Sequence, residues 1–146
     1  MDRLSKEHRR WNMSRIQEKN TRPEIAMRSL LHKNGFRFRL HEKKLPGKPD
    51  IVLPKFKTAI FVHGCFWHRH ENCKYCYTPK SRIDFWDSKF ERTVQRNADQ
   101  ISTLLKIGWL PIIVWECELK ENPENVQKRL RKILDKRLQK IQRDTQ

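Results

Sequence analysis

The stretch Asp50-Ile-Val-Leu-Pro-Lys-Phe-Lys-Thr-Ala-Ile-Phe-Val-His63 decides the fold of this chain. It holds two short apolar runs, residues 51–53 and 58–62, and each has the length and composition of a β-strand. Residues 54–57 are the whole connection between them, and so short a connection predicts an antiparallel hairpin. Asp50 immediately precedes the first strand and His63 ends the second. A carboxylate and an imidazole therefore flank the two apolar runs.

The sequence on either side of this hairpin predicts three helices and two further strands. Apolar positions recur at helical spacing in the helices, and they alternate or run continuously in the strands. The helices are expected over residues 21–34, about 81–107 and about 123–142, and the strands over 36–40 and 111–115. Helices before and after a small mixed sheet place the chain in the α/β class. The last helix is basic and amphipathic, and no internal repeat is present.

The chain carries a large excess of positive charge. It has 33 Lys and Arg against 17 Asp and Glu, a net charge of +16, and an isoelectric point of about 10.1. This excess favours a polyanionic partner, and nucleic acid is the first choice. The alternative is a basic protein that is merely soluble. The length of 146 residues suits one domain, expected over residues 21–146, with residues 1–20 as a polar, mobile arm.

The expected cellular location decides how the four cysteines are interpreted. No apolar stretch is long enough for a membrane span, and the N-terminus lacks the apolar run of a signal peptide. We therefore expect a cytoplasmic protein without a membrane partner. In the cytoplasm, cysteines are more often metal ligands or free thiols than disulfides.

A cluster of soft metal ligands follows the hairpin. Cys65, His70 and Cys73 lie within nine residues, and either Cys76 or Cys117 could be the fourth ligand. Structural zinc prefers a closed tetrahedral set of cysteine and histidine. The loop over residues 63–80 has few apolar side chains, so a zinc ion would give it the stability that packing does not. The alternative is a set of free cysteines beside a solvated histidine.

Asp50, His63 and His68 have the side chains that metal-assisted hydrolysis of a phosphodiester requires. Mg²⁺ binds through one or two carboxylates, substrate phosphates and waters. A neutral imidazole close to the scissile phosphate can take a proton from water at physiological pH. Glu24 has two interpretations, because it can complete a capping box with Thr21 or hold a metal-bound water. Each residue alone has a structural explanation, and only their conjunction favours catalysis.

Two large aromatic residues, Phe66 and Trp67, stand beside the expected zinc ligand Cys65. Such side chains either pack under the loop or form a wedge that enters a base step and unstacks it. A mismatched step is easier to open than a matched one. Trp86, at the start of the long helix, could join the same surface.

Several stretches of the chain together resemble the very-short-patch repair (Vsr) endonucleases. They run in order and at family spacing from about residue 8 to residue 119. They are Asn12-Met-Ser14 with Ile16, Thr21-x-x-Glu24, Leu45-Pro-Gly-Lys-Pro-Asp50, Ile60-Phe-Val-His-Gly-Cys-Phe-Trp-His68, Phe85-Trp86, Gly108-Trp109 and Val114-Trp-Glu-Cys117. The resemblance implies a restriction-endonuclease-like fold. It also implies a Mg²⁺-dependent nick 5′ to the thymine of a T·G mismatch left by deamination of 5-methylcytosine.

The resemblance also implies a role for each site residue. Asp50 and the backbone carbonyl of Val62 would hold Mg²⁺, and His63 and His68 would serve proton transfer and phosphate stabilisation, with Glu24 nearby. The zinc ligands would be Cys65, His70, Cys73 and Cys117, leaving Cys76 spare. The residues that enter DNA would be Phe66, Trp67 and Trp86 from the major groove and Met13, on a DNA-contacting arm, from the minor groove.

The implied partner is double-stranded DNA with a T·G mismatch, bound by a monomer in the bacterial cytoplasm and associated with the nucleoid. Mismatch-repair proteins of the MutL/MutS type and a cognate cytosine-5 methyltransferase system are further candidate partners. The chain departs from the family at three places. Val62 stands where Thr is common, one residue is added between His70 and Cys73, and Asn97 replaces a frequent carboxylate.

Two other functions compete with this one. A conventional type II restriction endonuclease commonly has a Glu-x-Lys pair on the strand after the first aspartate, but here that strand ends Phe61-Val-His63. Glu118-Leu-Lys120 fits the pattern but lies after Cys117, far from Asp50 in sequence. A non-catalytic zinc-stapled DNA-binding module would explain the charge and the cysteines. It would not explain why Asp50, His63 and His68 occur together.

Overall fold

A four-stranded mixed sheet forms the centre of the molecule in the computed structural model, which describes residues 21–145. The strands lie in the order β1 (Arg39–Leu40), β2 (Ile51–Leu53), β3 (Thr58–His63) and β4 (Leu110–Trp115). The pairs β1–β2 and β2–β3 are antiparallel, and β3–β4 is parallel. The predicted hairpin, the small mixed sheet and the α/β class are therefore confirmed. The expected N-terminal arm and Met13 lie outside the described residues.

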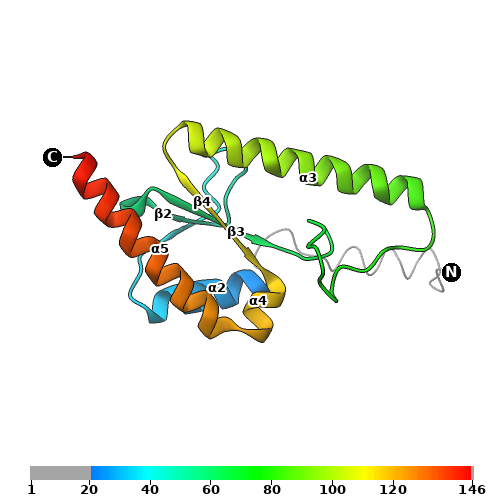
Figure 1. Ribbon diagram of the computed structural model, residues 1–146, viewed down its shortest axis with the longest axis horizontal. Coiled ribbons are helices and arrows are strands. Elements are labelled where there is room, and N and C mark those ends of the chain that lie inside the picture. The colour runs from blue at the N-terminus through cyan, green and yellow to red at the C-terminus, as the bar shows by residue number, and fades with distance from the viewer. Residues whose placement is uncertain (1–20, 146) are drawn as a thin grey trace.

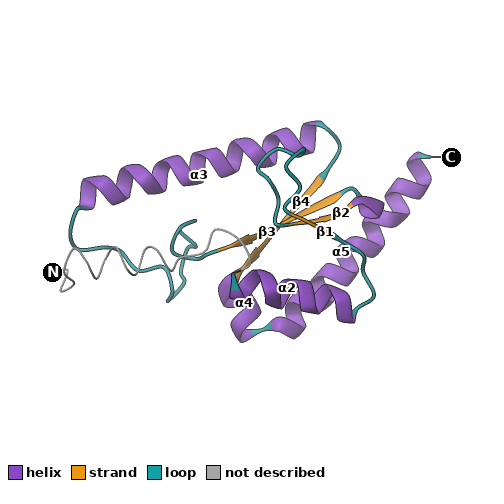
Figure 2. Ribbon diagram, turned by 180° about the vertical axis from the view of Figure 1, so that it is seen from behind, coloured by secondary structure: helices purple, strands orange, loops and turns teal. Residues whose placement is uncertain are grey.

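Helices cover both faces of the sheet (Figures 1 and 2). The long helix α3 (Ile83–Lys106) lies on one face, and α2 (Arg22–Lys33), α4 (Glu116–Glu121) and α5 (Pro123–Asp144) lie on the other. Successive side chains along β3 point to opposite faces of the sheet, so this strand contributes to the hydrophobic core on each face. Ile60 belongs to the larger core under α2, α4 and α5, whereas Ala59 and Phe61 join Leu104 of α3 in a smaller one. The buried residues of the larger core are Met27, Leu31, Ile51, Leu53, Phe56, Ile60, Ile112, Val114, Leu119, Val126, Leu130 and Leu134.

Helix α3 packs against the sheet over only part of its length. Its N-terminal half extends beyond the sheet and lies over the loop that follows β3 (Figure 1). Of its apolar residues only Phe90 and Leu104 are buried, whereas Phe85, Val94 and Leu105 are exposed. The helical spacing of the apolar residues therefore predicted the helix correctly, but it did not predict which of these residues are buried.

Two elements differ from the prediction. The strand expected over residues 36–40 is reduced to β1, because Phe36 and Phe38 turn toward the larger core. The short helix α4 was not predicted, since its sequence ECELKE has one long apolar side chain, Leu119, and no visible period. Among residues 21–145, no helix has the length and apolar content needed to cross a bilayer.

Candidate functional site

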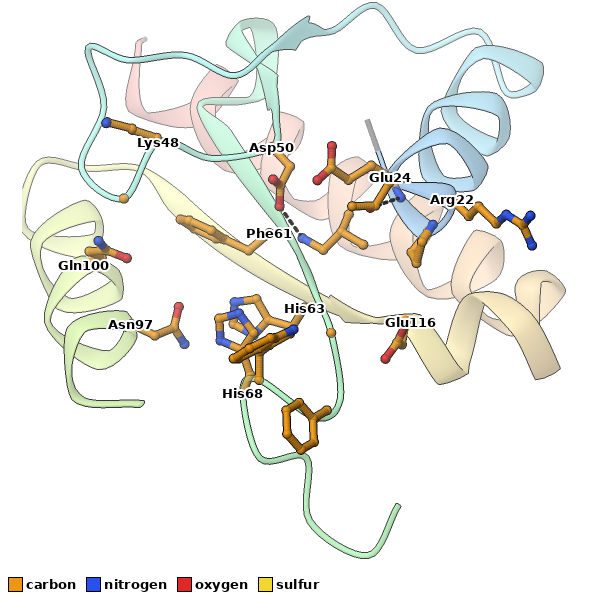
Figure 3. A pocket seen from close by; sticks show the side chains of 17 residues that line it. Arg22, Glu24, Lys48, Asp50, Phe61, His63, His68, Asn97, Gln100 and Glu116 are labelled. Carbon is orange, nitrogen blue, oxygen red and sulfur yellow. Dashed lines mark hydrogen bonds between the residues drawn. The ribbon is translucent and has the colours of Figure 1, made fainter. Parts of the chain in front are cut away.

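A cavity of about 530 Å³ opens where the polar ends of β2 and β3 meet the start of α2 and the middle of α3. All four residues predicted to be catalytic line it, namely Glu24, Asp50, His63 and His68 (Figure 3). Val62, Phe66 and Trp67 line it as well. Residues from five separate stretches of sequence are thus brought to one place.

The Asp50 carboxylate is fixed by a hydrogen bond, and its surroundings disfavour its charged form. Its Oδ2 accepts the backbone N–H of Val62 at 2.7 Å, across the β2–β3 hairpin (Figure 3). Burial raises the pKa of Asp50 to about 6, the Val62 N–H opposes this, and the nearby Glu24 adds to it. Binding of a divalent cation would offset the cost of the buried charge.

Glu24 is 4% exposed and takes part in a network rather than only in a helix cap. Its backbone N–H donates to the Thr21 Oγ1 at 3.4 Å, which confirms the cap. Its carboxylate Oε2 accepts from Arg28 at 3.3 Å and lies 3.2 Å from His41 Nε2. His41 was not predicted as a site residue, because it lies in a charged turn that resembles solvated surface.

His63 and His68 form a parallel stacked pair, with ring centroids 3.7 Å apart and an interplanar angle of 2°. Burial lowers the pKa of His63 to about 3 and that of His68 to about 4. The neighbouring His68 further lowers the pKa of His63, and Arg96 further lowers the pKa of His68. Within residues 21–145, neither ring has a hydrogen-bond partner for its buried Nδ1. Both rings are therefore neutral at physiological pH and able to accept a proton.

Asn97, one of the departures noted in the sequence, lies beside this pair. Interaction with its side chain raises the pKa of the His63 imidazole, against the larger opposing effect of burial. Asn97 also lines the cavity (Figure 3). An amide cannot supply the negative charge of a carboxylate, so His63 stays uncharged in this protein.

Four soft ligands come together from the loop after β3 and the start of α4. One ligand atom from each of Cys65, His70, Cys73 and Cys117 lies within 4.8 Å of the others, and Cys76 is outside this group. The Cys117 Sγ is 3.4 Å from His70 Nδ1. Burial raises the pKa of the Cys65 thiol well above its usual range. A bound metal would displace such protons, and the donor set suits zinc.

The residue added between His70 and Cys73 is accommodated by a local bulge. Asn72 has a φ of +55°, in the left-handed region that asparagine tolerates better than most residues. The Cys76 N–H then donates to the Cys73 carbonyl at 3.1 Å, so Cys76 lies in a tight turn next to the cluster. The sequence alone did not choose between Cys76 and Cys117, and the geometry favours Cys117.

Glu116 connects the cluster of cysteines and His70 to the cavity, and it was not predicted as a site residue. Its Oε1 accepts the backbone N–H of Cys65 at 2.9 Å, and its side chain lines the cavity. The neighbouring Trp115 stacks on His70, with ring centroids 4.0 Å apart. The only signal in the sequence was its position next to Cys117.

The three aromatic residues proposed as a wedge form one cluster at the cavity. The Phe66 ring centroid lies 5.1 Å from that of Trp67, 5.5 Å from that of Trp86 and 5.2 Å from that of Phe90. Phe66, Trp67 and Trp86 are partly exposed, whereas Phe90 is buried beneath them. The Nζ of Lys89 is 5.0 Å from the Trp67 ring centroid. The surface is therefore aromatic, open on one side and accompanied by positive charge.

The chain is similar to one protein family and to several named DNA endonucleases and nicking enzymes. Residues 1–74 match the family described as DNA mismatch endonuclease Vsr. The type II nicking enzyme V.XorIIP of Xanthomonas oryzae pv. oryzae is 51% identical over 92% of this chain and 97% of its own length. The type II nicking enzyme V.NmeAIP of Neisseria meningitidis is 44% identical over 84% of this chain and 89% of its own length. The DNA mismatch endonuclease Vsr of Escherichia coli is 41% identical over 75% of this chain and 69% of its own length.

Proposed function

The chain belongs to the Vsr family of DNA mismatch endonucleases, and we therefore propose that it nicks one strand of duplex DNA 5′ to the thymine of a T·G mismatch. The observation that carries this proposal is the convergence of Asp50, His63 and His68 in one cavity beside the aromatic cluster. A DNA-binding module without activity does not require a partly buried carboxylate in the same cavity as two neutral imidazoles. The +16 charge supports DNA as the partner.

The residues in the cavity fit a hard divalent cation. Asp50 and the backbone carbonyl of Val62 would hold Mg²⁺, with Glu24 close by. When bound, Mg²⁺ supplies charge stabilisation at the phosphoryl oxygen and the leaving oxygen. His68 and His63 act on protons, since their neutral rings can take one from the attacking water and return it to the leaving group.

The cluster of Cys65, His70, Cys73 and Cys117 fits a structural zinc ion. Zinc would fix the loop that carries Phe66 and Trp67, and the hydrogen bond from Cys65 to Glu116 supports this link. Phe66, Trp67 and Trp86 would then enter the duplex from the major groove, and Met13 would approach from the minor groove.

The wider setting follows from the same proposal. The antiparallel pairs β1–β2–β3 beside the parallel β4 support a restriction-endonuclease-like fold, formed by residues 21–146 as one domain. We propose a monomer that acts in the cytoplasm, associated with the nucleoid when bound to DNA. A cytosine-5 methyltransferase system and mismatch-repair proteins of the MutL/MutS type would be its functional partners.

A nicking assay tests the proposal directly. Labelled duplexes that differ only in a central T·G or T·A pair would be incubated with zinc-loaded protein, with and without Mg²⁺. We expect one cut, in the strand that carries the mismatched thymine, and only with Mg²⁺. Asp50→Ala should abolish the cut but retain binding to the T·G duplex, whereas Asp135→Ala, on the exposed side of α5, should cut normally. Cleavage of both strands would indicate a restriction endonuclease, and binding without any cut would indicate a DNA-binding module.

A further inference from the structure

Three possible metal ligands from separate elements converge beside the cavity. Glu24 is in the first turn of α2, His41 follows β1, and Asp50 precedes β2. One ligand atom from each lies within 4.8 Å of the other two. The set is two carboxylates and one imidazole, and all three side chains are at least half-buried.

The backbone of His41 is fixed to the same strand end as Asp50. The His41 N–H donates to the Asp50 carbonyl at 3.1 Å, which extends the β1–β2 pairing by one residue. His41 has a φ of +48°, a left-handed conformation that few residues other than glycine and asparagine adopt readily. A side chain held at this position is fixed relative to Asp50 by the shared hydrogen bond.

A simpler role for His41 would be as a positive partner of Glu24, whose Oε2 is 3.2 Å from His41 Nε2. Arg28 already supplies that charge, because its Nη2 is 3.3 Å from the same oxygen. The same Nη2 lies 3.5 Å from His41 Nε2, so Arg28 contacts both side chains and Glu24 needs no second positive partner. The imidazole nitrogen can therefore serve as a ligand for a cation held between the two carboxylates.

We propose that His41 is a third ligand, with Glu24 and Asp50, of the divalent cation at the cavity, and that its nitrogen shifts the preference of the site from Mg²⁺ toward Mn²⁺. This inference rests on the proposed function, since it concerns the same cation. Mg²⁺ prefers oxygen ligands, whereas an imidazole nitrogen favours first-row transition ions. The protein should therefore bind Mn²⁺ more tightly than a site made only of oxygen ligands would.

The test measures cation binding without DNA, on the full chain with its cysteine site loaded with zinc. Mn²⁺ binding would be followed by the loss of the free-ion signal in electron paramagnetic resonance, and Mg²⁺ binding by competition. His41→Gln should weaken Mn²⁺ binding about tenfold or more while changing Mg²⁺ binding far less. His32→Gln, in the exposed last turn of the same helix as Glu24, is the matched control and should bind like the wild type.

A second measurement detects the bound nitrogen directly, starting with the wild type. Pulsed electron paramagnetic resonance of the Mn²⁺-loaded wild type should show coupling to a directly bound nitrogen, and His41→Gln should lose it. If His41 only neutralises Glu24, its removal would leave Mn²⁺ affinity unchanged or increase it, and either result overturns the inference. Absence of the nitrogen coupling in the wild type would overturn it as well.

These outcomes are separable from the failure of the proposed function. Nicking of the T·G duplex without nitrogen coupling would remove His41 from the site and leave the endonuclease intact. Nitrogen coupling lost in His41→Gln, in a protein that nicks no duplex, would support the cation site and contradict the function.

Discussion

At the scale of single residues, the stacked pair of His63 and His68 makes stability depend on pH. Both pKa values fall from an ordinary value of 6.5, to about 3 and about 4, because burial disfavours the charged ring. The unfolded chain therefore takes up protons first as the pH falls. The stability contributed by neutral burial is complete above pH 6.5 and is lost progressively below it.

His63→Gln should reduce this loss. We expect the difference in unfolding free energy between pH 7 and pH 5 to shrink by about 1–2 kcal/mol, whatever the change in overall stability. Urea denaturation of zinc-loaded protein at a series of pH values would measure it. His32→Gln, an exposed histidine, should leave the pH dependence unchanged. An equal slope in His63→Gln and the wild type would show that His63 takes up a proton in the folded protein as readily as in the unfolded chain.

Asp50 contributes to stability with the opposite sign. Its pKa rises from 3.8 to about 6 in the folded protein, so the cost of its charge is absent at low pH and complete above pH 6. Asp50→Asn keeps an acceptor for the Val62 N–H and removes the charge. In Mg²⁺-free buffer at pH 7.5 we expect it to stabilise the fold by about 1–3 kcal/mol, and in a separate assay with Mg²⁺ it should abolish nicking. A less stable variant would mean that the carboxylate is already compensated in the free protein.

The sequence predicted most of the cavity at this scale because each residue belongs to a compact motif. Asp50, His63 and His68 all lie within one short stretch around the hairpin. His41 and Glu116 were missed for a physical reason. Each lies in a charged segment that resembles solvated surface. Their place at the site follows only from tertiary contacts, of His41 with Asp50 and of Glu116 with Cys65.

At the scale of elements, the loop after β3 has few buried apolar side chains, and the proposed zinc ion would hold it in place. Cys117→Ser should therefore lose zinc and loosen residues 64–82, because one ligand of the closed set is gone. Cys76→Ser, outside the set, is the matched control and should keep both. Metal analysis and hydrogen exchange of the loop would follow the two effects. Zinc lost from Cys76→Ser but retained in Cys117→Ser would reassign the fourth ligand.

The aromatic cluster gives a second prediction for this loop. Trp67 is partly exposed and packs edge-on against Phe66 and at a tilt against Trp86, so Trp67→Ala should weaken binding to T·G DNA about tenfold or more. Binding to matched DNA should change much less, because a matched step costs more to open. Fluorescence anisotropy with both duplexes measures the ratio. Equal losses on both, or mainly a lower melting temperature, would make Trp67 a packing residue.

Element prediction succeeded where a pattern was local. The hairpin followed from two apolar runs with a short connection, and the helix over Pro123–Asp144 from a regular apolar stripe. The strand at residues 36–40 was overestimated, since alternating phenylalanines also fit a segment that turns into the core. The buried face of α3 was not predictable, because half of that helix has no sheet to cover.

At the scale of the whole molecule, the net charge of +16 should dominate affinity but not discrimination. Binding that releases counterions weakens steeply with salt, whatever the sequence of the duplex. We expect the affinities for T·G and T·A duplexes to fall together between low and physiological salt, with their ratio nearly constant. Titrations at several salt concentrations would measure both slopes. Different slopes would mean that the mismatch changes the number of phosphate contacts.

The overhang of α3 beyond the sheet also bears on how such proteins diverge. Few side chains in that half of the helix are buried, so substitutions there carry little penalty for folding. Glu24, Asp50 and His63 of the cavity lie on α2 and on the hairpin, which contribute to the larger core. Substitutions along the overhang can therefore change the aromatic surface to which Trp86 belongs, while these three cavity residues keep their support.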